Sequence, residues 1–103
     1  MEDEMNEIVL TVNCNKMANA KVQRFKFDET LKRNGWYLMK HERATKEGSL
    51  TSTITIWTQS FLQEKPQPKI GKQIKNLLKR AAEWAEIKDY TADYVFEKKK
   101  YSI

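Results

Sequence analysis

The sequence contains a single cysteine, Cys14, and a single histidine, His41. One cysteine cannot form an internal disulfide bond, and one cysteine with one histidine falls short of the four ligands of a structural zinc site. We therefore expect neither a metal nor a cofactor. Nothing in the sequence places a histidine beside Cys14, so we interpret it as a small packed side chain rather than a nucleophile.

Long hydrophobic runs, internal repeats and low-complexity tracts are also missing. No apolar run approaches the ~20 residues that a helix needs to cross a bilayer. The opening MEDEMNE is acidic, where a secretory signal would begin with basic residues. These absences predict a cytoplasmic protein without a membrane segment.

The sequence does have enough apolar material for one core. Hydrophobic residues make up 40% of the chain, including three Trp, four Tyr and four Phe. A length of 103 residues suits one two-layer core and is short for two. We therefore expect a single domain over residues 1–103.

The first third of the chain predicts two strands and a short helix. Residues 7–13 are β-rich, and residues 21–27 alternate apolar and polar side chains, which is typical of strands. Asp28 then suits the N-cap of a short helix, and Gly35 suits the left-handed residue that follows a helix.

The middle of the chain predicts a hairpin. Its arms are residues 36–44 and 49–57, joined by TKEG. In the second arm Leu50, Ile54 and Ile56 alternate with three threonines and Trp57, so we expect the isoleucine face to build the core and Trp57 to lie on the polar face. LQEKPQPK, residues 62–69, is the expected linker, because its two prolines disfavour regular structure.

The last third predicts a long helix and a final strand with a basic tail. From Ile70 onward, apolar residues recur at the spacing of one helix face, and the side chain of Lys88 extends that face. Residues 90–96 alternate as in a strand. The expected fold class is α+β: an antiparallel sheet of about four to five strands with two helices packed on one face. The residues of the helix stripe are Ile70, Ile74, Leu77, Leu78, Ala81, Trp84, Ala85 and Lys88.

The long helix begins in a strongly basic segment, PKIGKQIKNLLKR, residues 68–80. Its five cations account for the formal net charge of +5, because the remaining basic residues equal the 14 acidic ones in number. A helix dipole favours acidic residues in the first turn and basic ones in the last, and this helix has the opposite arrangement. A functional explanation is that the segment binds phosphates, whereas the alternative is an ordinary solvated surface.

The phosphate interpretation defines a set of candidate binding residues and no catalytic ones. Trp57 is a candidate for base stacking if it is exposed. His41 has no evident acid or base partner on its strand, so catalysis is a minority interpretation. The candidate nucleic-acid or partner-binding residues are Lys69, Lys72, Lys75, Lys79, Arg80, Lys98, Lys99, Lys100 and Trp57.

Three short motifs resemble the HicA-type toxin family, small ribonucleases with a double-stranded-RNA-binding-domain-like fold. They are LKRNGWYL at 31–38, a hairpin containing Gly48 and Ser49, and PKIGKQIKNLLKRA at 68–81. In that family a Gly-Ser-His turn supplies the catalytic histidine, but here Leu50 and Thr51 follow Ser49. The resemblance therefore implies the fold and RNA affinity, with cleavage lost.

The sequence thus favours a small non-catalytic protein that binds RNA or DNA through its basic helix. A second hypothesis is a protein-binding inhibitor or accessory factor, from a phage or another mobile element, that docks the same helix on an acidic or nucleic-acid-handling partner. A divergent HicA-like ribonuclease is the third. Two copies could also pair into a homodimer through an exposed sheet edge.

Overall fold

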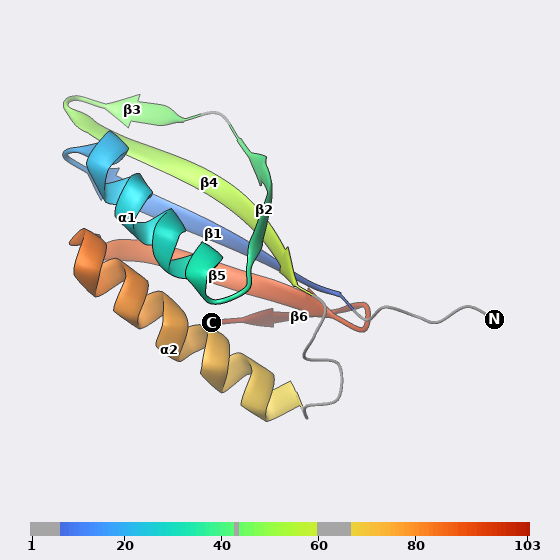
Figure 1. Cartoon of the computed structure of the whole chain (residues 1–103). Coiled ribbons are helices and arrows are strands. Elements are labelled where there is room, and N and C mark those ends of the chain that lie inside the picture. The colour runs from blue at the N-terminus through green and yellow to red at the C-terminus, as the bar shows by residue number, and fades with distance from the viewer. Residues whose placement is uncertain (1–6, 43, 60–66) are drawn as a thin grey trace.

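A computed structural model describes residues 7–42, 44–59 and 67–103 of the chain (Figure 1). These residues form six strands and two helices. Their bounds are β1 Ile8–Met17, α1 Ala20–Arg33, β2 Tyr37–His41, β3 Thr45–Glu47, β4 Leu50–Gln59, α2 Gln67–Ala85, β5 Asp89–Phe96 and β6 Lys99–Ser102.

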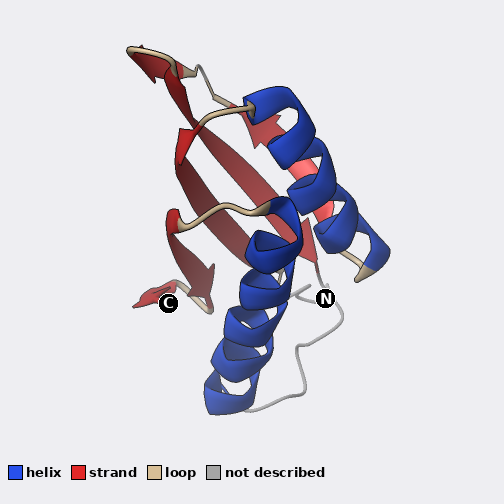
Figure 2. Ribbon diagram, turned by 90° about the vertical axis from the view of Figure 1, so that its left-hand side faces the viewer, coloured by secondary structure: helices blue, strands red, loops and turns tan. Residues whose placement is uncertain are grey.

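The strands form one antiparallel sheet in the order β2-β4-β1-β5-β6, and β3 pairs with β4 on the same side as β2. Both helices lie on one face of this sheet (Figure 2). The predicted α+β class is therefore confirmed, with one more strand than expected. The order places β1 between β4 and β5, which is the split β-α-β arrangement of ferredoxin-like domains with two strands added, β3 and β6.

The core lies between the sheet and the two helices. Alternate residues of β1 point into it, because successive side chains of a strand face opposite sides. The most completely buried large side chains come from both the sheet and the helices, and the buried apolar residues form one cluster. The buried apolar residues of β1 are Ile8, Leu10, Val12, Cys14 and Met17.

The expected strand at 21–27 is wrong, because these residues belong to helix α1. Asn19 begins the helix, and its backbone amide donates to the side-chain Oε1 of Gln23 at 2.9 Å. Phe27 and Leu31 are buried one turn apart, while Val22 and Phe25 are exposed. The burial of two large side chains, worth about 1.5–3 kcal/mol each, outweighs the strand-like alternation.

The predicted helix end is confirmed and the predicted start is not. Asp28 lies in the middle of α1 and is therefore no N-cap. Gly35 has φ 88°, and the amide of Trp36 donates to the carbonyl of Leu31 at 3.1 Å, as in a glycine-terminated helix.

The hairpin is present, but its faces are the reverse of those expected. The predicted connection TKEG is wrong for its first three residues, which form strand β3. The turn is Gly48–Ser49 between β3 and β4, and β2 pairs with the second half of β4. Trp57 is fully buried with Thr53 and Thr55, whereas Ile54 and Ile56 are only half-buried on the other face. The indole N–H of Trp57 donates to the Thr55 hydroxyl at 2.8 Å, which lets both polar groups enter the core.

Helix α2 carries the predicted stripe with two exceptions. Lys88, predicted to extend the stripe, lies beyond the end of α2 and is exposed. The stripe residues from Ile70 to Ala85 are buried, but Trp84 is 48% exposed, with the Lys26 ammonium 5.9 Å from its ring centroid. Pro68 lies in the first turn, where a helix tolerates proline. Most of the expected linker, residues 62–66, lies outside the described residues. The final basic tail is a strand, β6, joined to β5 by the turn at Glu97 and Lys98.

In the described part of the chain, neither helix is long and apolar enough to cross a membrane.

Candidate functional site

The predicted cationic residues are all exposed, but they lie on different elements. The five cations at 69–80 lie on α2, Lys98 lies in the β5–β6 turn, and Lys99 and Lys100 lie on β6. Lys100 is 3.9 Å from the Asp93 carboxylate, while no α2 cation has an ion pair within the described residues. Trp57, the predicted stacking residue, is buried in the core and has no face for a base. That part of the prediction is wrong.

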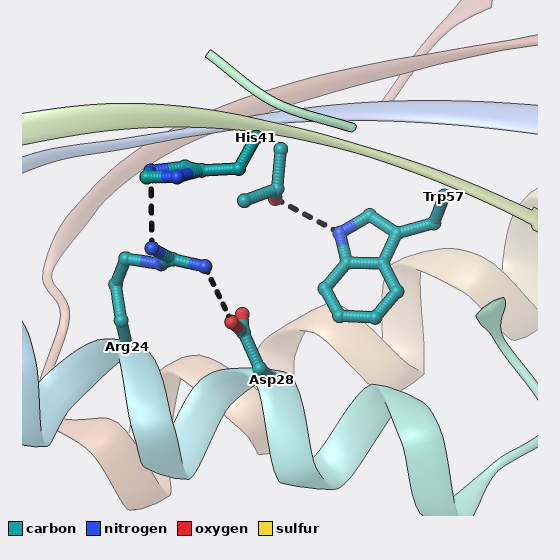
Figure 3. Close-up of polar contacts among 5 residues, drawn as sticks. Arg24, Asp28, His41 and Trp57 are labelled. Carbon is teal, nitrogen blue, oxygen red and sulfur yellow. Dashed lines mark hydrogen bonds and ion pairs between the residues drawn. The ribbon is translucent and has the colours of Figure 1, made fainter. Parts of the chain in front are cut away.

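A polar cluster joins α1 to the edge of the sheet (Figure 3). One terminal nitrogen of Arg24, Nη2, donates to the Asp28 carboxylate at 2.6 Å, and the other, Nη1, lies 3.1 Å from Nε2 of His41 on β2. An arginine can only donate, so Nε2 of His41 is the acceptor in this contact. Arg24, Asp28 and His41 are hereafter called the Arg24 cluster.

Burial raises the pKa values of two groups in and beside this cluster, Asp28 and Cys14. The pKa of Asp28 is raised, because burial outweighs the opposing effect of Arg24. Burial, with a contribution from the Asp28 charge, also raises the pKa of Cys14 to about 12. Cys14 is therefore a protonated, packed thiol, which agrees with the sequence interpretation.

A hollow of about 380 Å³ lies beside the Arg24 cluster. Its walls include Lys21, Phe25 and the hydroxyl-bearing Thr53. Both terminal nitrogens of Arg24 are already bonded within the protein, to Asp28 and His41. The cluster connects α1 to β2, while Nε of Arg24 and Oγ1 of Thr53, both buried and without a hydrogen-bond partner in the described residues, belong to residues that line this hollow.

A second, larger groove of about 870 Å³ separates the two helices. The side-chain Nε2 of Gln23 donates to the backbone carbonyl of Glu86 across it, at 2.9 Å. Burial and the Glu83 carboxylate raise the pKa of Tyr90 at one end. Its size suits a ligand, but none of the unpartnered buried polar atoms of the described chain belongs to a residue of this groove.

The third hollow, of about 390 Å³, is lined by four carboxamide side chains and is hereafter called the amide pocket. It lies where the end of α1, the start of β2 and the end of β4 meet one face of α2. The α2 residues recur at spacings of three and four, so they project from one side of the helix. The lining residues are Asn34, Trp36, Gln59, Gln73, Ile74, Asn76, Leu77 and Arg80.

Gln59 is the most informative residue of the amide pocket. It is 6% exposed, and its side-chain Oε1 has no hydrogen-bond partner within the described residues. A buried acceptor without a donor is unfavourable, so a ligand that supplies a donor would be favoured there. Sequence reasoning missed Gln59, because a single glutamine at a strand end carries no motif. Of the predicted binding residues, Arg80 alone lines this pocket.

No protein-family model matches the chain, and no curated protein matches it either. Two solved structures share its fold over the whole length. The first is of a phage SAM lyase in the apo state, 13% identical, with a TM-score of 0.62 over 100% of this chain and 94% of that one. The second is of a phage SAM lyase in complex with S-methyl-5′-thioadenosine, also 13% identical, with a TM-score of 0.53 and the same coverage. At this identity the likeness shows the fold.

The comparison contradicts two sequence-based predictions. We expected a protein without enzymatic activity, and we expected nucleic acid as its ligand, with an inhibitor as the alternative. The similar proteins are lyases, and one of them is bound to a small adenosine compound. The exposed lysines of α2 misled the prediction, because surface charge alone does not distinguish a binding face from a solvated one. The HicA resemblance stays a hypothesis; Gly35 and Trp36 have a structural explanation in the end of α1.

Proposed function

We propose that this protein is an enzyme that binds S-adenosylmethionine and cleaves it as a lyase. The observation that carries the proposal is the likeness of the entire chain to phage SAM lyase structures. A phage or other mobile-element origin, expected from the sequence, belongs to the same proposal.

The chemistry of this reaction can be carried out by the side chains of a small protein. The sulfur of S-adenosylmethionine is positively charged, so breaking its bond to the aminobutyrate chain leaves the bonding electron pair on sulfur. The released S-methyl-5′-thioadenosine is a neutral thioether. The four-carbon fragment closes a ring through its own carboxylate, or loses a proton and forms a double bond. Neither route consumes water, so the protein mainly has to bind and orient the substrate.

The amide pocket supports the proposal by its size and lining. Its volume of about 390 Å³ falls in the usual range for small-ligand sites. Carboxamides offer donors and acceptors together, as the edge of a nucleobase requires. Arg80 at the same pocket offers a guanidinium to a substrate carboxylate.

The test is to incubate the purified protein with S-adenosylmethionine and follow the products by liquid chromatography and mass spectrometry. We expect S-methyl-5′-thioadenosine together with a four-carbon product one water lighter than homoserine. Homoserine as the first product would indicate hydrolysis and contradict the lyase assignment. Unchanged substrate, in a preparation that melts cooperatively, would reject the proposed function.

A control variant separates the enzyme from a contaminating activity. Arg80→Met removes the guanidinium from the amide pocket, and Arg33→Met removes an equal charge from the exposed surface of α1, where Arg33 is 3.6 Å from Glu29. We expect Arg80→Met to raise KM, because it loses a substrate contact, and Arg33→Met to match the wild type. If the wild type and both variants are equally active, the substrate does not bind at the amide pocket.

A further inference from the structure

The unpartnered side chain of Gln59 gives the amide pocket a specific acceptor. Its Oε1 is buried and has no donor within the described part of the chain, although Gln59 lines a cavity large enough for a ligand. Gln59 stands on β4 opposite Ile8 of β1, so the strand pairing fixes the position of its backbone. A buried acceptor on a fixed backbone discriminates between ligands with and without a donor.

The walls around this acceptor suit a flat heterocycle. Trp36 contributes an almost fully buried aromatic side chain, and Ile74 and Leu77 contribute apolar surface from α2. Gln73 and Asn76 carry further carboxamides on the same helix face, and both are exposed. Paired carboxamide contacts to the amino group and ring nitrogen of adenine are a common mode of recognition.

We propose that the amide pocket binds the adenine base of an adenosyl ligand, with Gln59 accepting a hydrogen bond from the exocyclic amino group. The inference rests on the proposed function for the identity of the ligand, and on the geometry of Gln59 for the choice of base. Gln59 is then a specificity-determining residue. It selects adenine against hypoxanthine, in which a carbonyl oxygen replaces the amino group and meets the Gln59 oxygen as a second acceptor.

The experiment compares two ligands by isothermal titration calorimetry, S-methyl-5′-thioadenosine and its 6-oxo analogue S-methyl-5′-thioinosine. We expect the wild type to bind the adenine compound at least about tenfold more tightly, the change expected for one buried hydrogen bond gained or lost. Gln59→Leu keeps a similar volume without the acceptor and should bind both ligands equally. Gln59→Glu keeps an acceptor oxygen and should retain the preference for adenine.

The matched control is Gln23→Leu, which changes the groove between the helices and leaves the amide pocket intact. It should keep the full preference for adenine. If Gln23→Leu loses the preference instead, the base binds in the larger groove and the inference is wrong. Thermal melting of each variant shows whether it is folded, and the two-ligand comparison on the wild type needs no variant.

The outcomes separate this inference from the proposed function. The wild type could cleave S-adenosylmethionine but bind the two ligands equally, or Gln59→Leu could keep the preference for adenine. Either result overturns the role of Gln59 and leaves the enzyme assignment in place. A preference for adenine that depends on Gln59, without cleavage, rejects the lyase and retains the adenine site. Failure to bind either ligand overturns the adenine site.

Discussion

Arg24 is the residue whose surroundings make the clearest prediction about stability. Its side chain is 21% exposed, that of Asp28 is 14% exposed, and the two are joined at 2.6 Å. Replacing Arg24 by Met would leave the Asp28 carboxylate half-buried without its cation. We expect Arg24→Met to lower the free energy of unfolding by about 1–3 kcal/mol at neutral pH, measured by urea denaturation.

The pH dependence of this loss follows from the raised pKa of Asp28. A carboxyl with a higher pKa in the folded state contributes stability below its unfolded pKa and loses that contribution as the pH rises through the folded pKa. Arg24 opposes the rise, so its removal raises the pKa of Asp28 further. The variant therefore regains more stability than the wild type as the pH falls. The difference in unfolding free energy between the two proteins should begin to shrink at a pH just above the usual pKa range of carboxyl groups.

Arg33→Met is the matched control, since Arg33 also pairs with a carboxylate four residues away on α1. That pair is 3.6 Å long and the arginine side chain is 73% exposed, so solvent screens it. Its loss should change stability by less than about 0.5 kcal/mol at either pH. Equal losses for the two variants would mean that burial around Asp28 has no energetic effect.

At the scale of elements, α2 is held by its buried stripe and opposed by its own charges. Its first turn contains no acidic residue and its last turn no basic one. Replacing Lys69 by Glu, in the first turn, should raise the free energy of unfolding by about 0.3–1 kcal/mol through the helix dipole. Thermal and urea denaturation measure the change.

Lys79→Glu alters the net charge of the protein by the same amount and serves as the control. It turns the Lys79–Glu83 attraction into a repulsion and the Lys75–Lys79 repulsion into an attraction. Because these i, i+4 effects are similar in size, it should change stability by less than about 0.3 kcal/mol. Stabilisation by both substitutions would show that the total positive charge, rather than the helix dipole, opposes folding.

The β5–β6 turn offers a second prediction at this scale. Glu97 and Lys98 have φ 55° and 67°, in the left-handed region that favours glycine. Lys98→Gly should raise stability by about 0.5–1 kcal/mol, because it relieves this strain in a two-residue hairpin turn. Lys99→Gly, one residue later in strand β6, should lower it by about 0.5–1 kcal/mol. If both glycines destabilise, the turn conformation is not strained.

The elements also show what the sequence could reveal. The stripe of α2, the strand β1 and the Gly35 helix end follow from local periodicity and glycine geometry. The faces of β4 do not, because threonine and isoleucine both suit strands, and the choice between them depends on the partners of Trp57 across the core. The start of α1 was obscured by apolar residues at 22, 25 and 27, which fit either period. The amide pocket collects residues from four segments, which only the folded chain brings together.

At the scale of the whole molecule, both helices of the described residues lie on one face of the sheet, and its other face carries neither of them (Figure 2). Val9, Ile54, Ile56 and Val95 lie on this face, half-buried or exposed. The outer strands are less suited to pairing, since lysines stand on β6 and on β2 and β3, and edge lysines oppose strand addition. The homodimer predicted to form through an exposed sheet edge therefore stays a prediction, and the open face is a better suited surface for it than either edge.

Analytical ultracentrifugation tests this association. We expect the wild type to sediment above the monomer mass and Ile56→Lys to sediment as a monomer, because a stable interface of roughly 1,200 Å² or more cannot easily bury an unpaired charge. Ile56 pairs with Thr11 on one side and Lys40 on the other, so the new lysine stands well inside the face. Val22→Lys, on the helical side and already exposed, should leave the wild-type mass unchanged. If the wild type sediments as a monomer, the open face is exposed to water and the predicted association is wrong. If both variants sediment as monomers while the wild type does not, the interface includes the helical side.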